Sequence, residues 1–294
     1  MEFPLEHHQI RTNGLLLHVV QCGPTGGALV VLLHGFPEFW YGWRHQLQAL
    51  AAAGCRVWAP DQRGYNLSDK LTRTSDYRIE QLGADVLGLL DAADTQKAML
   101  VGHDWGAAVV WWLAEHHPER LQRVAVLNVP HPAVLGRVLR HRPRQLLKSW
   151  YLFFFQVPWL PEQLFRRRAF RFGRRALRGT SRPGTFSSDD LRHYVRAWAQ
   201  PGALTGMLNW YRAAFRHTRA SAPSRLLTVP VRILWGRKDA FLVPELAQAS
   251  LELCENGRLT YFDEATHWLH HEEPAAVNRL LLEFLQGESV PVVS

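Results

Sequence analysis

Three residues with the chemistry of a nucleophile, an acid and a base each follow an apolar, strand-like run of the sequence. Asp104 is the centre of Gly-His-Asp-Trp-Gly at 102–106, and Asp239 and His267 come later in the chain. A carboxylate nucleophile needs a base to activate water, and that base needs a second carboxylate to orient it. Because each residue follows a predicted strand, we expect all three on loops at one edge of a sheet. We therefore predict a catalytic set of Asp104, Asp239 and His267.

The segment around Asp104 has the spacing of a tight strand-to-helix turn. Gly102 and Gly106 leave the room that such a turn needs, because a Cβ at either position would collide with neighbouring backbone. The turn lifts Asp104 above the carboxyl edge of the sheet and beside a helix N-terminus, where partial positive charge favours an anion. We predict that Asp104 is ionised there.

A carboxylate nucleophile predicts a particular reaction. It can attack a saturated carbon and leave an ester whose carbonyl belongs to the protein. His267 can then deprotonate a water molecule that attacks this carbonyl. The resulting oxyanion needs backbone N–H donors. We expect Trp105, directly after the nucleophile, and Phe36, on the loop after the first buried strand, to supply them.

The elements that must hold these residues alternate in the pattern of a parallel sheet covered by helices. Two alternating segments flank Asn13-Gly14, which is a strong signal of a β-hairpin. The strand–helix alternation stops after residue 130 and resumes at 231. We predict an α/β fold with a doubly wound, mostly parallel sheet and an antiparallel hairpin at one edge. The expected strands are 6–12, 15–21, 28–33, 56–60, 99–101, 124–127, 231–235 and 258–262, and the expected helices are 43–52, 79–93, 105–117, 244–254 and 274–286.

The positive charge of the chain, +8 overall, is concentrated in residues 131–222. This segment contains 18 Lys and Arg but three acidic residues, and it lacks strand signals. We predict that it is an inserted helical cap over the carboxyl edge of the sheet, and that residues 1–130 and 223–294 form the core domain. The length of 294 residues and the hydrophobic content of 47% are sufficient for such a core and exclude disorder.

The cysteines and the N-terminal segment predict a cytoplasmic protein. The three cysteines are few, odd in number and without a Cys-x-x-Cys motif, which is typical of a reducing compartment. The N-terminal segment has no apolar signal, and no run approaches the roughly 18 apolar residues of a membrane span. The 15 histidines lack metal-ligand spacing, so we expect neither a metal nor a cofactor.

Four features together resemble the epoxide hydrolases of the α/β-hydrolase fold. They are His-Gly-Phe-Pro-Glu at 34–38, the turn at 102–106, Asp239 and His267, and the similarity extends from the N-terminal hairpin to the last predicted helix. The resemblance implies the α/β-hydrolase fold with an inserted helical cap. It also implies addition of water to an epoxide, giving a vicinal diol through a hydroxyalkyl ester on Asp104, with a small-molecule epoxide and water as the partners.

The same resemblance implies two proton donors on the cap. Ser-Trp-Tyr-Leu-Phe-Phe-Phe-Gln at 149–156 and Leu-Asn-Trp-Tyr-Arg at 208–212 are similar to the two tyrosine motifs of the family, and they place the donors at Tyr151 and Tyr211. An opening epoxide develops an alkoxide, which acidic O–H donors stabilise. The apolar residues nearby favour lipophilic epoxides. The expected substrate-binding residues are Phe36, Trp105, Phe153, Phe154, Phe155, Trp210, Leu242 and Trp268.

A dehalogenase of the same fold is an alternative, because haloalkane and haloacid dehalogenases also use an Asp nucleophile. A departing halide needs N–H donors and no proton. Haloalkane dehalogenases carry Trp at the position of Trp105 but usually Asn at that of Phe36, whose side chain cannot donate. Fluoroacetate dehalogenases typically carry Arg at the position of Trp105. These differences favour an epoxide.

A non-catalytic binding protein that acts through the Arg-rich part of the cap is the second alternative. Such a surface could meet anionic lipid or nucleic acid. A solvated helix face, or a subunit contact in a homodimer, explains the same pattern. The intact Asp104, Asp239 and His267 favour an enzyme, so we expect no nucleic-acid partner. The arginines are Arg166, Arg167, Arg168, Arg171, Arg174, Arg175 and Arg178.

Overall fold

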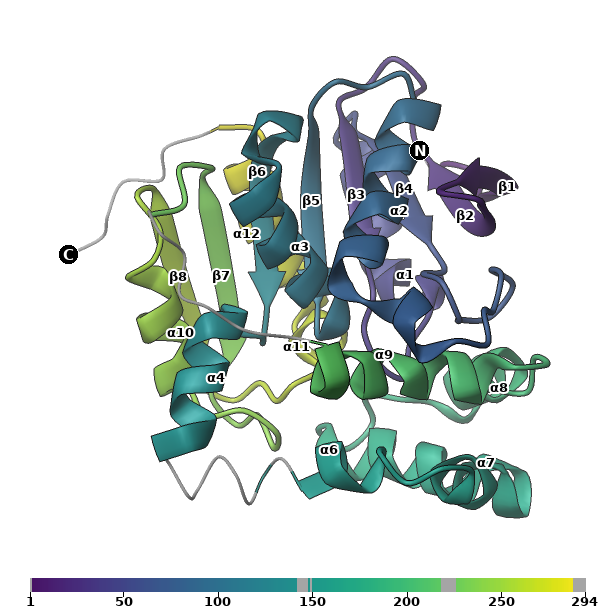
Figure 1. Cartoon of the computed structure of the whole chain (residues 1–294). Helices are drawn as coiled ribbons and strands as arrows, with labels where there is room; N and C mark the ends of the chain where they lie inside the picture. Colours follow the sequence, from purple (N-terminus) through teal and green to yellow (C-terminus); the bar gives the residue numbers. More distant parts are fainter. Residues whose placement is uncertain (1, 142–147, 149, 218–225, 288–294) are drawn as a thin grey trace.

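The centre of the molecule is an eight-stranded sheet in the order β1-β2-β4-β3-β5-β6-β7-β8, flanked by helices (Figure 1). The computed structural model describes residues 2–141, 148, 150–217 and 226–287. β2 pairs antiparallel with β1 and β4, and all other neighbouring strands are parallel. The predicted sheet with its antiparallel edge hairpin is confirmed. The strands are β1 (Glu6–Thr12), β2 (Leu15–Cys22), β3 (Leu29–Leu33), β4 (Arg56–Pro60), β5 (Ala98–His103), β6 (Leu121–Leu127), β7 (Val231–Gly236) and β8 (Gly257–Phe262).

Alternate residues of the central strands supply two separate cores, one on each face of the sheet. In β3, Val31 and Leu33 belong to one core, whereas Val30 and Leu32 belong to the other, as the period of two in a strand requires. This burial on both faces explains the continuous apolar runs in the sequence. Full burial of such side chains contributes about 1.5–3 kcal/mol each.

Helices cover both faces of the sheet. Residues of α2, α3 and α10 contribute to the core that contains Val31, and residues of α1 and α12 contribute to the core that contains Val30. α10 ends three residues earlier than expected, because the backbone at 253–255 hydrogen-bonds with Leu227 instead of continuing the helix. These helices are α1 (Arg44–Ala52), α2 (Ile79–Ala92), α3 (Trp105–His116), α10 (Glu245–Leu251), α11 (Leu269–Glu272) and α12 (Pro274–Leu285), with short 3-10 helices at Trp40–Trp43, Thr74–Tyr77 and Pro118–Arg120.

A helical segment lies between β6 and β7, at the end of the sheet where the parallel strands finish. α8 and α9 lie next to the sheet, and α6 and α7 form the outermost layer of the view (Figure 1). α7 bends where residues 167–170 leave helical dihedral angles. The predicted domain boundary at 130/131 stays a prediction, and that at 222/223 lies outside the described residues. The helices are α4 (Pro132–His141), α6 (Trp150–Phe154), α7 (Leu160–Thr180), α8 (Ser188–Trp198) and α9 (Ala203–His217).

Buried hydrogen bonds fix α8 and α9 to loops of the sheet. The Trp198 indole N–H donates to the carbonyl of Pro37 at 2.6 Å, and the Trp210 indole N–H donates to that of Arg63 at 3.0 Å. Each bond satisfies a buried polar group that would otherwise be costly. These contacts hold the helical segment over the carboxyl ends of β3 and β4. No helix in the described ranges is long and apolar enough to cross a bilayer.

Candidate active site

Asp104 occupies a strained turn between β5 and α3. Its φ of 49° and ψ of −121° lie in a region that non-glycine residues rarely adopt. A Cβ added to Gly102 would clash with the carbonyl of Gly106, and one added to Gly106 would clash with that of Leu33. The two glycines therefore allow the close approach that the sequence predicts for this turn.

Asp104, His267 and Asp239 meet at the carboxyl edge of the sheet. His267 Nδ1 lies 2.7 Å from Asp239 Oδ2, and its Nε2 lies 3.5 Å from Asp104 Oδ2. Asp104 follows β5, Asp239 follows β7, and His267 follows β8 after a short loop. Because Asp239 accepts the Nδ1 proton, His267 directs Nε2 toward Asp104, as a base acting beside that carboxylate requires.

Backbone and side-chain donors hold the Asp239 carboxylate. Its Oδ1 accepts the N–H groups of Phe241 and Leu242 at 2.7 and 3.0 Å. Its Oδ2 also accepts the Asn128 amide at 2.6 Å. Asn128 follows β6, so it is a further polar residue at a strand end, and this position is the signal that could have found it.

The two carboxylates control the charge of His267. Burial alone would lower the pKa of the His267 imidazole, but Asp239 and Asp104 outweigh burial and raise this pKa to about 10. Burial works in the opposite direction on the carboxyls, and His267 nevertheless holds the pKa of Asp104 and of Asp239 below the usual value. At neutral pH an imidazolium therefore lies between two carboxylates.

A backbone donor already contacts the Asp104 carboxylate. The N–H of Phe36, on the loop after β3, donates to Asp104 Oδ1 at 2.7 Å. Trp105 is the first residue of α3, where backbone N–H groups have no partner within the helix. The two amides predicted to hold an oxyanion therefore come from two elements: that of Phe36 from the loop after β3, and that of Trp105 from the start of α3.

Tyr151 and Tyr211 bring two phenols from the helical segment to the same place. Tyr151 is on α6 and Tyr211 on α9, and their ring centroids are 6.0 Å apart. The Tyr211 ring lies 5.0 Å from that of Trp105 and 5.2 Å from that of Phe36. Burial, followed by the negative charge of Asp104, raises the pKa of both phenols. Both phenols are therefore protonated at neutral pH and able to donate.

Comparison with known proteins places this arrangement in a family. Residues 28–274 match the family model described as the alpha/beta hydrolase fold. The chain is 48% identical over 279 residues to the AB hydrolase superfamily protein YfhM of Bacillus subtilis (strain 168), covering 95% of this chain and 97% of that protein. It is 38% identical over 287 residues to epoxide hydrolase 4 of Homo sapiens, covering 96% of this chain and 78% of that protein.

A solved structure agrees with both comparisons. A mutant of an epoxide hydrolase from Bacillus megaterium, complexed with its product, a naphthyloxy-propane-1,2-diol, has a TM-score of 0.85 to this chain. It is 31% identical, and the match covers 95% of this chain and 100% of that one. The chain belongs to the epoxide hydrolases of the α/β-hydrolase fold. The family that the sequence motifs resemble is thereby confirmed.

The apolar residues expected to bind substrate in this epoxide hydrolase fall into two groups, one around Tyr211 and one beside the candidate catalytic residues. Phe155 is buried against Tyr211, with ring centroids 4.9 Å apart, and Phe36, Trp105 and Phe154 pack partly buried around them. Three more of the expected residues are buried next to Asp104, Asp239 and His267. Trp210 lies against Trp105, Leu242 beside Asp239, and Trp268 against His267.

Phe153 does not take part in this apolar wall. It is 53% exposed, and its ring lies 5.8 Å from the exposed ring of Phe215. Phe155 directly follows α6, and its N–H donates to the carbonyl of Tyr151 at 2.9 Å, so it lies on the same side as Tyr151. Phe153 is two positions from each, about 200° around the helix. Helical periodicity therefore turns Phe153 to the outer face, away from Tyr151 and Phe155, and its role in substrate binding stays a prediction.

A second buried cluster, which the sequence did not predict, surrounds Glu38. Tyr194 and His271 donate to Glu38 Oε1 at 2.6 and 2.7 Å, and His103 Nδ1 lies 3.1 Å from Oε2. The Arg44 guanidinium donates to His271 Nδ1 at 2.9 Å, so the Nε2 of His271 carries the proton that Glu38 accepts. The cluster therefore ties α8 of the helical segment to the core of the epoxide hydrolase.

The Glu38 cluster also contains the ligand types of a metal site. Glu38, His270 and His271 each offer a ligand atom, and these atoms lie within 4.8 Å of one another. Both oxygens of Glu38 already have hydrogen-bond partners in the cluster. We therefore interpret the cluster as a hydrogen-bonded network.

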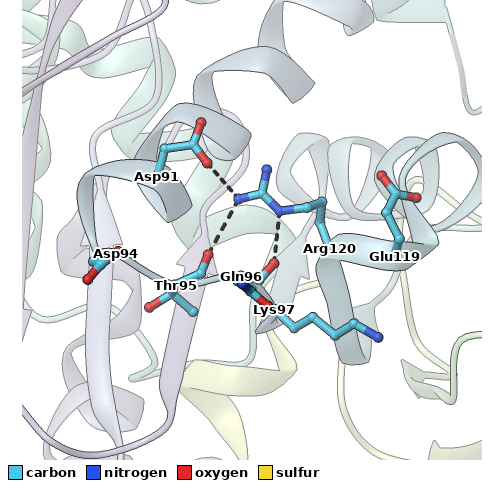
Figure 2. Close-up of a pocket in the computed structure, with 7 residues that line it drawn as sticks. All are labelled: Asp91, Asp94, Thr95, Gln96, Lys97, Glu119 and Arg120. Carbon is cyan, nitrogen blue, oxygen red and sulfur yellow. Dashed lines mark hydrogen bonds and ion pairs between the residues drawn. The ribbon is translucent and has the colours of Figure 1, made fainter.

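A surface hollow of about 450 Å³ lies at the opposite edge of the sheet (Figure 2). Gln96 and Lys97 directly precede β5, whereas Asp104 directly follows it. Ligands of open α/β sheets bind outside the carboxyl ends of the strands, so this hollow is not the candidate active site. Arg120 already donates to Asp91 Oδ1 at 2.7 Å and to the carbonyl of Gln96 at 2.8 Å. The lining residues are Asp91, Asp94, Thr95, Gln96, Lys97, Glu119 and Arg120.

Proposed function

We propose that this chain adds water to lipophilic epoxides and releases vicinal diols through an ester on Asp104. The observation that carries the proposal is that two protonated phenols lie near the partly buried carboxylate of Asp104, which has its own histidine and acid. The product of the Bacillus megaterium relative is a vicinal diol with an aromatic substituent. The aromatic residues around Tyr211 are compatible with a substrate of this lipophilic class.

In the first half-reaction, Asp104 attacks a carbon of the epoxide ring. The bond between this carbon and the epoxide oxygen breaks, and Tyr151 and Tyr211 donate hydrogen bonds to the developing alkoxide. A phenol gives the oxygen its proton, and the proton held by His267 replaces it. The products are a hydroxyalkyl ester on Asp104 and a neutral His267, so charge and protons balance.

The second half-reaction follows from the loss of charge on Asp104. Esterification removes one of the anions that raise the pKa of His267, so the imidazole becomes able to act as a neutral base. It takes a proton from water as the water oxygen attacks the ester carbonyl. The amides of Phe36 and Trp105 hold the oxyanion. Collapse releases the diol and restores the carboxylate and the imidazolium.

In this proposal residues 131–222 form the cap that carries both phenols. A reducing compartment, such as the cytoplasm, is supported by the free thiols of Cys22, Cys55 and Cys254. Burial raises the pKa of each thiol and so disfavours the reactive thiolate. A homodimer stays a prediction, which gel filtration at several protein concentrations tests.

A substrate panel tests the proposed reaction. The purified protein is incubated with aryl glycidyl ethers, styrene oxide, a chloroalkane and fluoroacetate, and diol and halide are quantified. We expect diol from the epoxides and no halide, because two O–H donors suit an alkoxide. Asp104→Ala is the matched control for background hydrolysis. Halide release without diol formation would make the chain a dehalogenase and overturn the proposal.

A further inference from the structure

Large apolar side chains are exposed on the outermost helices of the cap. Trp159 is 75% exposed, Trp150 is 59% exposed, and Phe215 of α9 contacts the exposed Phe153. A soluble surface rarely gathers so many large apolar groups without using them. We name this surface the outer cap face, defined by Trp150, Phe153, Val157, Trp159, Leu160, Leu164 and Phe215 together with the exposed arginines of α7.

The arginines of the outer cap face have little negative charge near them. Glu162, the acid within α7, is buried and paired with Arg212 at 2.8 Å. Asp189, at the start of α8, pairs with Arg192. In the described part of the chain, six exposed arginines of α7 have no carboxylate partner. They are Arg166, Arg167, Arg168, Arg171, Arg175 and Arg178, of which Arg178 donates to the Ser188 hydroxyl.

This combination matches the chemistry of an anionic bilayer surface. Tryptophan and phenylalanine are favoured at the headgroup level, and each Arg near anionic lipid adds an electrostatic attraction. Nucleic acid would also attract the arginines, and its bases could stack on the aromatic rings. The exposed aliphatic side chains of Val157, Leu160 and Leu164 have no role in such stacking. They gain free energy only from an apolar environment, so lipid is favoured.

We propose that the outer cap face docks this epoxide hydrolase on anionic phospholipid membranes. Trp150, Phe153 and Trp159 enter the headgroup region, and the arginines of α7 contact lipid phosphates. The inference rests in part on the proposed function, because α6 carries both a proposed proton donor and a residue of the outer cap face. Tyr151 lies against Tyr211, with ring centroids 6.0 Å apart, whereas Phe153, two residues later, is exposed. A lipophilic epoxide dissolved in the bilayer would thus meet the enzyme at its cap.

Vesicle flotation tests the docking. Wild-type protein is mixed with vesicles of phosphatidylcholine alone and of phosphatidylcholine with phosphatidylglycerol, at low and high salt. We expect at least about tenfold tighter binding to the anionic vesicles at low salt. High salt should remove this preference and leave the weaker binding that the apolar side chains provide. Trp150→Ser/Trp159→Ser should weaken binding at both salt concentrations, and Arg171→Glu/Arg175→Glu should weaken it by about tenfold or more at low salt.

A matched control separates the outer cap face from net charge. Arg11→Glu/Arg258→Glu makes the same change of charge at exposed positions of β1 and β8, two strands of the sheet outside the cap. We expect it to bind anionic vesicles within about twofold of wild type. Turnover of a water-soluble epoxide should be unchanged in all these variants, which also shows that they fold. Vesicle binding without epoxide turnover by wild type would leave the docking intact and refute the proposed function alone.

Three results would overturn the docking. The first is equal binding of wild type and the Arg171→Glu/Arg175→Glu variant to anionic vesicles. The second is salt-sensitive binding to an oligonucleotide with none to vesicles, which would assign the arginines to nucleic acid. The third is a dimer that Trp150→Ser/Trp159→Ser abolishes, with no vesicle binding, which would assign the outer cap face to a second copy of the chain.

Discussion

Two buried clusters of histidines and carboxylates lie side by side in this protein, and they differ in composition. The proposed catalytic cluster places one ring, His267, between the carboxylates of Asp104 and Asp239. The Glu38 cluster places several rings around a single carboxylate. The two are connected, because the Nε2–H of His103 donates to the backbone carbonyl of His267 at 2.9 Å.

The different ratio of carboxylates to rings gives the clusters opposite protonation. The pKa of His267 rises to about 10 because two anions outweigh burial. Burial dominates in the other cluster and lowers the pKa of His270 and of His271, since they share Glu38. The first cluster therefore stores a proton next to Asp104, whereas the second keeps the rings of His270 and His271 neutral. The comparison predicts that equivalent substitutions will have unequal effects in the two clusters.

The largest difference between the clusters is expected when one carboxylate in each is replaced by its neutral amide. Asp239→Asn should lower kcat by about 10⁴-fold, because the ring loses the acceptor that orients it and the anion that stabilises its charge. Glu38→Gln should leave kcat within about tenfold of wild type and destabilise the fold by about 3–5 kcal/mol. Steady-state kinetics and urea unfolding measure the two effects. Equal losses of kcat would show that the clusters do not have separate roles.

Substitutions of the tyrosines should show the same contrast between lost activity in one cluster and lost stability in the other, with smaller effects. Tyr151→Phe and Tyr211→Phe should each lower kcat/KM by about tenfold, since the other phenol still donates, and the double variant should lose about 10³-fold. Tyr194→Phe removes a phenol of the Glu38 cluster, and we expect it to cost about 1–3 kcal/mol of stability with kcat unchanged. A double variant no worse than the single ones would contradict the shared role of the two phenols.

The stability of the fold should depend on pH in opposite ways through the two clusters. The raised pKa of His267 contributes stability that is complete below pH 6.5 and is lost as pH rises toward about 10. The lowered pKa of His270 and of His271 means that the unfolded chain binds the extra protons, so stability falls as pH drops below 6.5. Each group contributes a slope of at most about 1.4 kcal/mol per pH unit.

Two variants separate these contributions when the free energy of unfolding is measured in urea between pH 5 and 10. His267→Gln should remove part of the loss of stability at alkaline pH, and His271→Gln should remove part of the loss at acid pH. If both variants kept the wild-type profile, the assigned directions of the pKa shifts would be wrong.

The smallest effect is expected at Asn128. Asn128→Ala removes one of the donors to Asp239 Oδ2 but leaves the two backbone donors to Oδ1 in place. We expect a loss of about 1–2 kcal/mol in stability and a fall in kcat of less than about tenfold. A fall comparable with that of Asp239→Asn would show that Asn128 does more than hold the carboxylate.

The sequence was sufficient for the catalytic cluster because its members follow strands. Asp104, Asp239 and His267 follow β5, β7 and β8, and parallel strands bring such ends to one edge of the sheet. Glu38, His103 and Tyr194 have no common local signal, and tertiary packing alone unites them. Local sequence therefore could not indicate the second cluster.

The same distinction applies to the residues expected to bind substrate. Aromatic content marks 153–155 as apolar, but the helical period sends Phe153 outward and Phe155 inward. The bend of α7 at residues 167–170 also lacks a sequence signal, because neither Pro nor Gly occurs there. Composition thus indicates that a helical segment is present, but it does not indicate the direction of the individual side chains.

The most direct test of the account is mass spectrometry of the His267→Gln variant with a lipophilic epoxide. Without the base, the phenols still supply a proton for ring opening, but hydrolysis of the ester stalls. We predict that the protein gains the mass of the epoxide, that the peptide containing Asp104 carries the adduct, and that Asp104→Ala/His267→Gln gains none. Wild-type turnover by His267→Gln, or an adduct on any other residue, would contradict Asp104 as the nucleophile and His267 as the base.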